Sequence, residues 1–205
     1  MPDASPSRPD QDLSDLIRAA QKGSAGGRPP VDKWNPDFCG DLDMEIQSDG
    51  TWFYLGTPIG RAALVKLFSS VLIEEGGSYF LVTPVEKVGL RVEDAPFVAV
   101  EMAVQNQGLP DQTLILRTNV GDVVEVGPSN PLRFAFEGEE NRLKPYTLVR
   151  DVRGRLEALL ARPLLYQLVD LGEEIEVAGE TMFSVRSGGE VYPIMPADEL
   201  ARLSA

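Results

Sequence analysis

Apolar and polar residues alternate with a period of two between residues 41 and 46. The two faces are Leu42, Met44 and Ile46 on one side and Asp41, Asp43 and Glu45 on the other. This period is that of a half-buried strand. The turn residues Ser48, Asp49 and Gly50 follow, and then the aromatic stretch TWFYLG. The pattern therefore predicts a β-hairpin.

Three segments carry helical signals. Apolar residues repeat with helical spacing in the segment DLSDLIRAAQK (12–22). Thr57 and Pro58 are typical of a helix start, and an apolar stripe follows as far as EEGG (74–77). This stripe comprises Leu64, Leu67, Phe68, Val71 and Leu72. The stretch 150–171 predicts a third helix, kinked or divided at Pro163 because proline lacks a backbone donor.

The remaining apolar runs predict further strands. They are residues 78–83, 88–94, 96–105, 113–118, 121–127, 132–138, 145–149, 174–179, 181–185 and 190–194. Residues 44–92 and 132–194 then share one order, which is hairpin, helix and strands. We predict an α+β fold with two domains and a duplicated hairpin-helix-strand core. The expected parts are a flexible N-terminus with a short helix and linker (1–28), an N-terminal domain (29–95) and a C-terminal domain (96–205).

The amino-acid composition excludes several classes of function. The chain has 205 residues, Cys39 is its only cysteine, and histidine is absent. Catalysis by Ser-His-Asp or Cys-His groups and His-ligated metals are thereby excluded. We expect no cofactor and no bound metal, and an enzyme is the less favoured reading. No apolar run reaches the length of a membrane span, and the N-terminus lacks a signal peptide pattern, so we expect a cytoplasmic protein without a membrane partner.

The net charge of −13 argues against nucleic acid as a partner. Between residues 142 and 162, however, six cations face only Asp151 and Glu157, a local charge of +4. The six are Arg142, Lys144, Arg150, Arg153, Arg155 and Arg162. They are expected either to bind phosphates or an acidic partner, or to neutralise the acidic remainder of the molecule.

Several segments together resemble a known family. They are WNP (34–36), DGTWFY (49–54), GTPI (56–59), LVTPVEK (81–87), VEDAPF (92–97) and RTN (117–119). In this combination they are similar to the proteobacterial domain-of-unknown-function family 1285, from about Pro29 to about Leu171. The resemblance implies two domains with a duplicated core, the second superficially like a pleckstrin-homology barrel. It also implies a site for a nucleotide-like ligand between the domains and a role in signalling.

Arg61 is the sharpest candidate for a binding residue. It is predicted to lie in the first turn of the helix that starts at Thr57, where the helix dipole disfavours a cation. Something anionic is expected to compensate. One reading is an ion pair with an aspartate of the preceding hairpin, namely Asp41, Asp43 or Asp49. The other is a bound phosphate or carboxylate, held by Arg61 and the helix N-terminus.

Other polar or aromatic residues stand where strands or linkers end, a common place for ligand contacts. With Thr57 and Arg61, the predicted ligand-binding set comprises Trp34, Thr83, Glu86, Arg117, Asn119 and Arg150. Trp34 would supply an apolar wall, the arginines charge, and Thr57 and Thr83 hydrogen bonds. Asn119 has a competing reading as a residue of a hairpin turn.

Two functional hypotheses follow. The first is a non-enzymatic protein that binds a small anionic, nucleotide-like ligand between the two domains. The alternative is a protein-interaction module whose basic 142–162 surface binds an acidic protein partner. A metal-dependent enzyme using Asp41 and Asp43 is the weakest reading, because alternate strand residues lie about 6.6 Å apart and no acid–base motif accompanies them.

Overall fold

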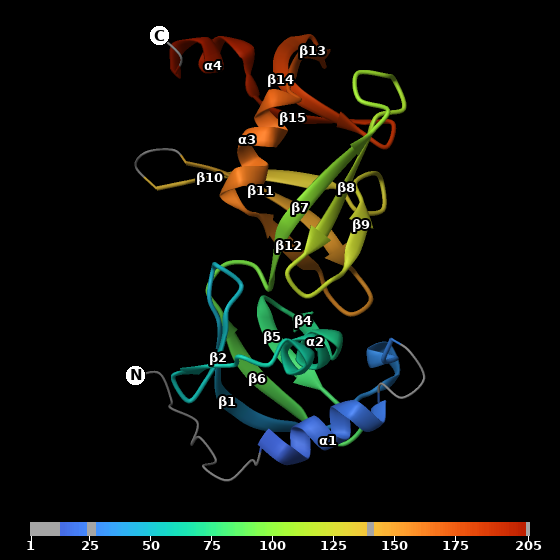
Figure 1. Cartoon of the computed structure of the whole chain (residues 1–205), viewed down its shortest axis with the longest axis vertical. Helices are drawn as coiled ribbons and strands as arrows, with labels where there is room; N and C mark the ends of the chain where they lie inside the picture. Colours follow the sequence, from blue (N-terminus) through green and yellow to red (C-terminus); the bar gives the residue numbers. More distant parts are fainter. Residues whose placement is uncertain (1–12, 24–27, 139–141, 204–205) are drawn as a thin grey trace. The chain divides into compact units, whose positions relative to one another are not determined.

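The computed structural model describes residues 13–23, 28–138 and 142–203 (Figure 1). Residues 1–12 and 24–27, where the flexible start and most of the linker were expected, lie outside the described residues. The chain forms two compact units. The first comprises residues up to 97 together with 150–156, and the second comprises 98–149 and the residues from 157 onward. Each unit is described by itself.

One six-stranded sheet forms the framework of the first unit, in the order β3-β2-β1-β6-β5-β4. Its strands are β1 (Phe38–Ile46), β2 (Trp52–Tyr54), β3 (Thr57–Pro58), β4 (Leu72–Glu75), β5 (Ser78–Val82) and β6 (Lys87–Val92). The hairpin predicted from the alternating pattern is confirmed, because β1 pairs antiparallel with β2. The central pair, β1 and β6, is parallel.

Helix α2 (Ala62–Ser70) covers one face of this sheet. The Phe68 ring stacks on Trp52 at 6.2 Å, and Met44 and Ile46 of β1 are fully buried. Helix α1 (Leu13–Gly23), which the apolar spacing predicted, packs beside α2 (Figure 1). On the other face of β1, Asp41 and Asp43 are exposed, which confirms the predicted solvated face.

The predicted helix start at Thr57 is wrong. Thr57 and Pro58 form β3 and pair with Tyr54 and Phe53, because the chain reverses at Leu55 and Gly56, which both have positive φ. Proline is tolerated there since β3 is an edge strand that needs no donor from Pro58. The helix begins only at Ala62 and ends before Leu72, which opens β4 instead of continuing the helical stripe.

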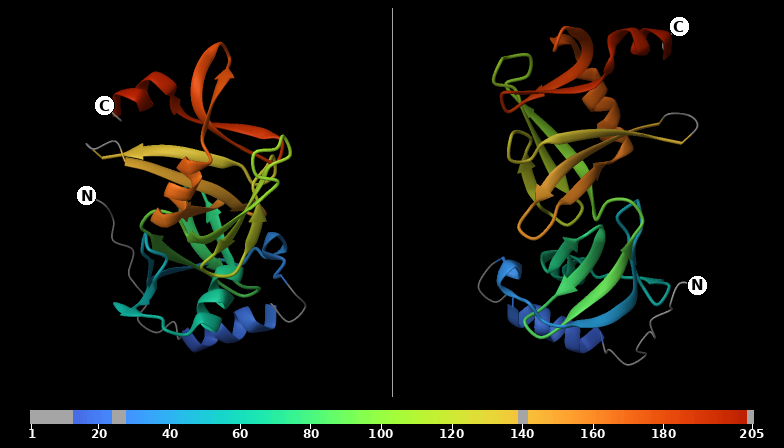
Figure 2. Two further views of the ribbon diagram at one scale, coloured as in Figure 1. Left: turned by 45° about the horizontal axis from the view of Figure 1, so that its top comes forward. Right: turned by 180° about the vertical axis from the view of Figure 1, so that it is seen from behind.

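The second unit contains two sheets (Figure 2). The first has the order β10-β11-β12-β7-β8-β9, and the second has the order β13-β14-β15. Their strands are β7 (Phe97–Gln105), β8 (Thr113–Thr118), β9 (Val123–Glu125), β10 (Leu132–Glu137), β11 (Arg142–Arg150), β12 (Leu156–Leu160), β13 (Glu173–Val177), β14 (Glu180–Ser187) and β15 (Glu190–Pro196). The helices are α3 (Arg162–Asp170) and α4 (Ala197–Leu203). The sequence reading missed α4.

The predicted helix over 150–171 is wrong in its first half. Leu156, Ala158 and Leu160 are buried while the residues between them are less so, which is the period of a strand, and they form β12. Pro163 does not kink a helix. It stands in the first turn of α3, where its missing donor costs nothing.

The two halves repeat one order of elements, as predicted. Three strands, a helix and three strands occur twice, first as β1–β3, α2 and β4–β6, and again as β10–β12, α3 and β13–β15. Strands β7–β9 stand between the repeats in the chain. The protein is thus a mixed α+β protein with two similar domains. No helix within the described residues is both long and apolar enough to cross a membrane.

Candidate functional site

A cavity of about 230 Å³ in the first unit gathers several arginines. Its walls come from the segment before β1, from α2 and β4, and from residues 150–156, which lead from the end of β11 to the start of β12. The lining residues are Arg28, Pro29, Pro30, Val31, Asp32, Ser70, Leu72, Arg150, Val152, Arg153, Gly154 and Leu156.

Local sequence fixes two of these walls. Pro29 and Pro30 restrict the backbone and lead into the short helix η1 (Val31–Lys33), where Val31 N–H donates to the Pro29 carbonyl at 2.9 Å. Opposite, Gly154 has φ +81°, and a Cβ there would collide with the backbone oxygen of Glu74. Only glycine therefore lets residues 150–156 approach β4 so closely.

Arg150 is the most buried arginine of the cavity, with 9% of its surface exposed. Its guanidinium carbon lies 4.8 Å from the centre of the Phe97 ring, a cation–π contact. The predicted site residue Arg150 is thus placed in a cavity wall. Its guanidinium is buried beside an aromatic ring, where charge interactions are stronger than at the open surface.

Arg153 ties the cavity wall to the sheet. Its Nε donates to Glu75 Oε1 at 2.7 Å, and its Nη1 donates to the carbonyls of Val31, at 3.2 Å, and Trp34. Lys87 Nζ contacts the other oxygen of Glu75 at 2.7 Å. The hydrogen bond from Lys87, followed by Arg153, holds the pKa of Glu75 below its usual value.

The electrostatic sign of this cavity is opposite to that of the whole chain. Three guanidinium groups and one carboxylate, that of Asp32, line it, and Glu75 behind the lining pairs with Arg153, so a positive excess remains while the net charge of the chain is −13. Such a cavity suits a phosphate or carboxylate, which arginine recognises with two parallel hydrogen bonds. Among residues 13–23, 28–138 and 142–203, no group of three or more acidic or Cys side chains is arranged to hold a metal ion.

Arg61 is not in the cavity. It is the N-cap residue of α2, with an extended backbone (φ −91°, ψ 100°) and an exposed side chain, so the predicted position in the first turn is wrong. Its guanidinium pairs with no residue that the structure describes, and the expected ion pair with a hairpin aspartate is absent there. Thr57 is exposed in β3 and caps no helix.

Thr83, Glu86 and Trp34 serve local structure. Thr83 is fully buried, and its Oγ1 accepts the N–H groups of Val85, at 3.4 Å, and Glu86, at 3.2 Å, which closes the turn around Pro84. Trp34 packs against the apolar cluster of Val31, Ile73 and Val82. Its contribution to the cavity is indirect, through the carbonyl that holds Arg153.

Arg117 and Asn119 belong to the second unit. Arg117 Nε donates to Glu101 Oε2 at 2.7 Å, and this pairing lowers the pKa of Glu101 and raises that of Arg117. Asn119 Oδ1 accepts a hydrogen bond from the N–H of Val98 at 3.1 Å. This bond holds the turn after β8 against the start of β7. Both side chains are therefore already engaged within this unit.

The six cations between residues 142 and 162 come from different elements. Arg142, Lys144 and Arg150 belong to β11, Arg153 and Arg155 precede β12, and Arg162 opens α3. Arg150, Arg153 and Arg155 belong to the first unit, and Arg162 belongs to the second. Lys144 pairs with Glu137, and Arg162 donates from Nε to the Tyr166 hydroxyl at 3.0 Å. The binding of an acidic protein partner by the basic 142–162 residues stays a prediction.

Sequence reasoning missed Arg28, Ser70 and Leu72 as neighbours of Arg150. In the sequence-based prediction, Arg28 belonged to a linker and Leu72 to the apolar stripe of a helix. Only the pairing of β4 and the return of residues 150–156 bring these positions together. The one local signal was the Arg-Pro-Pro sequence at 28–30, in which a cation is followed by a stiff backbone.

The fold and this site define a two-domain α+β protein with a repeated order of elements and an arginine-lined cavity in its first unit. Two family models match it, DUF1285 N-terminal domain over residues 29–95 and DUF1285 C-terminal domain over residues 96–194. Both are described as domains of unknown function. The chain belongs to the DUF1285 family, as the sequence motifs predicted.

Two solved structures are similar to this chain. A DUF1285 family protein from Silicibacter pomeroyi DSS-3 is 47% identical, with a TM-score of 0.80, and the match covers 91% of this chain and 98% of that one. A DUF1285 family protein from Shewanella baltica OS155 is 30% identical, with a TM-score of 0.49, and covers 63% of this chain and 92% of that one. No curated protein matches the chain.

Proposed function

We propose that the protein is a non-enzymatic binding protein for a small anionic ligand, held by the cavity of Arg28, Arg150 and Arg153. The observation that carries this proposal is the positive lining of a partly open cavity in a strongly acidic chain. Guanidinium groups bind phosphate and carboxylate with geometric specificity, and partial burial strengthens the interaction.

The cavity volume limits what is bound inside it. About 230 Å³ is below the range of roughly 300–1,000 Å³ typical of sites for drug-sized ligands. A phosphate or carboxylate group with a few further atoms is therefore the part we expect to be enclosed. In a nucleotide-like ligand, which the family resemblance implies together with signalling, the phosphate would enter and the base would remain outside.

The three arginines have different parts in this proposal. Arg28 is exposed at the edge of the cavity, so it is the residue that a ligand meets first. Arg150 supplies charge from a buried position. Arg153 holds the wall in place through Glu75 and two carbonyls, and its substitution would change the shape of the cavity as well as its charge.

A thermal-shift titration with inorganic phosphate, adenosine monophosphate and uncharged adenosine tests the proposal. We expect the two phosphate compounds to stabilise the protein, by about 2.7 kcal/mol at 100 times their Kd, and adenosine to have no effect. Added salt should weaken this stabilisation, because the contacts are between charges.

Arg28→Gln should remove most of this stabilisation without disturbing the fold. Arg61→Gln is the matched control, since it removes the same charge from an exposed position outside the cavity. Loss of binding in Arg61→Gln but not in Arg28→Gln would place the site at α2 instead. Stabilisation by none of the anions, in a folded protein at low salt, would refute the proposal.

A further inference from the structure

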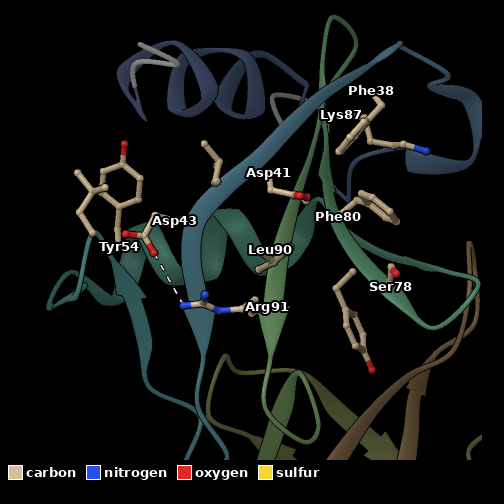
Figure 3. A pocket seen from close by; sticks show the side chains of 13 residues that line it. Phe38, Asp41, Asp43, Tyr54, Ser78, Phe80, Lys87, Leu90 and Arg91 are labelled. Atoms are coloured by element: carbon tan, nitrogen blue, oxygen red, sulfur yellow. Dashed lines mark ion pairs between the residues drawn. The ribbon is translucent and has the colours of Figure 1, made fainter. Parts of the chain in front are cut away.

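A second hollow, of about 890 Å³, lies on the face of the first sheet that α2 does not cover (Figure 3). It shares no lining residue with the arginine cavity. Its floor is formed by β1 and β6, two strands in the middle of the sheet with partners on both sides. No strand edge is therefore available for a peptide to extend the sheet, and recognition here must come from side chains.

Asp41 lies at the centre of this hollow and contacts Gly89 across β1 and β6. A Cβ at Gly89 would collide with Asp41 Oδ1 and would lie 3.7 Å from Phe38 Cε2. Glycine at position 89 thus lets the carboxylate rest on the sheet, next to an aromatic ring. Figure 3 shows Asp41 reaching from β1 toward β6, on the side where Phe38 and Phe80 lie.

The aromatic side of the hollow already holds a cation. The Phe38 and Phe80 rings meet edge to face, with centres 5.9 Å apart and planes at 87°. Lys87 Nζ lies 4.7 Å from the centre of the Phe80 ring. The Phe80 ring thus accepts an ammonium group, and Phe38, which is 52% exposed, presents a second ring beside Asp41.

The charges in and beside the hollow leave a negative excess. Lys87 pairs with Glu75 at 2.7 Å, and Arg91 pairs with Glu45 at 3.1 Å and approaches Asp43 at 3.9 Å. Arg153 shares Glu75 with Lys87. Four carboxylates thus face three cations. Asp41, the fourth, forms no ion pair or hydrogen bond with any residue that the structure describes.

We infer that this hollow is a binding site for a small organic ammonium compound, independent of the arginine cavity. The ammonium group would bind Asp41, and the alkyl chain attached to it would lie against Phe38 and Phe80. The volume falls within the usual range for small-molecule sites, and the net charge of −13 attracts cations from solution.

Titration of the whole protein with butane-1,4-diamine, followed by backbone amide NMR, tests this inference. We expect saturable shifts centred on Asp41 and Gly89, and none with butane-1,4-diol, which has the same chain without charge. Asp41→Asn should raise the Kd for the diamine about tenfold, as loss of a charge-assisted hydrogen bond does. Phe38→Leu should raise it about two- to fivefold.

Glu125→Gln is the control for general attraction, because Glu125 is exposed on β9 in the second unit and its loss changes the net charge equally. It should leave the Kd within about twofold of the wild-type value. An equal weakening in Glu125→Gln and Asp41→Asn, or equal binding of the diol, would overturn the inference. Unchanged phosphate binding by folded Asp41→Asn would show that the two sites are separate, and its loss would contradict their independence.

Discussion

Two junctions, one in each unit, fix a segment that is distant in sequence against a sheet. In the first unit residues 150–156 pack on β4, and Glu74 N–H donates to the Arg153 carbonyl at 3.1 Å. In the second unit the end of β14 packs on β8 and on the residues after β9. There Gly188, with φ +59°, lies so close to Val126 that a Cβ would be 2.6 Å from its carbonyl oxygen. Both junctions therefore depend on a glycine and on close backbone contact.

The side chains that secure the two junctions differ in kind. The first uses charge, through Arg153 and Glu75. The second uses neutral groups, because the buried Ser187 hydroxyl accepts Leu114 N–H at 2.9 Å and donates to the Val126 carbonyl at 2.8 Å. Gln112 adds a bond from Nε2 to the Arg186 carbonyl at 2.9 Å. The two units therefore contain the same order of elements but use different kinds of side chain to hold a distant segment against a sheet.

Gly154→Ala should have the largest effect on stability. Alanine is strained at φ +81°, and its Cβ collides with a backbone oxygen that belongs to a paired strand. We expect a loss of about 3 kcal/mol or more in the free energy of unfolding, measured by urea denaturation. Gly77→Ala is the control, since φ is +83° there but nothing lies within 4 Å of the added Cβ. It should cost only about 1–2 kcal/mol, and equal losses would show that the close approach is unimportant.

Arg153→Met should come second, with a loss of about 2 kcal/mol. The arginine side chain is only 18% exposed, and its removal leaves Glu75 and two carbonyls without this donor. Arg186→Met in the second unit is the matched comparison, because Arg186 pairs with Glu173 at 2.6 Å, the distance from Arg153 Nη2 to Glu75, but is 43% exposed. That variant should lose less than about 1 kcal/mol. Similar losses in the two variants would contradict the importance of burial.

Local patterns predicted most of the strands, the α1 helix and the repeated order of elements. They failed where a tertiary contact overrode local preference. Thr57 and Pro58 satisfy the rules for a helix start, yet the turn at Leu55 and Gly56 returns them to β2. Residues 156–160 read as helix when taken with α3, but their burial alternates because they form a strand of a sheet.

The candidate sites were less predictable than the fold. Arg150 was recognised from its surroundings in sequence, but its partners in the cavity lie about 80 and 120 residues earlier in the chain. Arg61 was favoured as a binding residue because it was expected in the first turn of a helix that starts at Thr57, but α2 begins at Ala62. Asp41 was considered as an ion-pair partner of Arg61 and as a metal ligand, but not as part of an aromatic hollow, because the proximity of Phe38 and Gly89 depends on the parallel pairing of β1 with β6.

Ser187→Ala should cost about 1–2 kcal/mol, because it leaves a buried donor and a buried acceptor without their partner. Ser184→Ala is the matched control on the same strand. Ser184 is equally buried, but its hydroxyl donates only locally, to the Met182 carbonyl at 3.2 Å. We expect a loss of less than about 1 kcal/mol for that variant in the same urea assay. Equal losses would mean that the neutral junction contributes little.

The smallest predicted effect concerns pH: the charged junction should contribute to stability in a pH-dependent way, and the neutral junction should not. The pKa of Glu75 is lowered in the folded protein by Lys87 and Arg153, so its contribution to stability is fully present above the unfolded pKa of about 4.3 and is lost as the pH falls through the folded value. The difference in unfolding free energy between wild type and Glu75→Gln should therefore be about 1 kcal/mol or less at pH 7 and shrink below about pH 4. The deficit of Ser187→Ala should not change over the same range, because no titrating group takes part in its hydrogen bonds. Urea midpoints at several pH values measure both differences, and a pH-independent deficit in Glu75→Gln would show that the first junction does not depend on this charge.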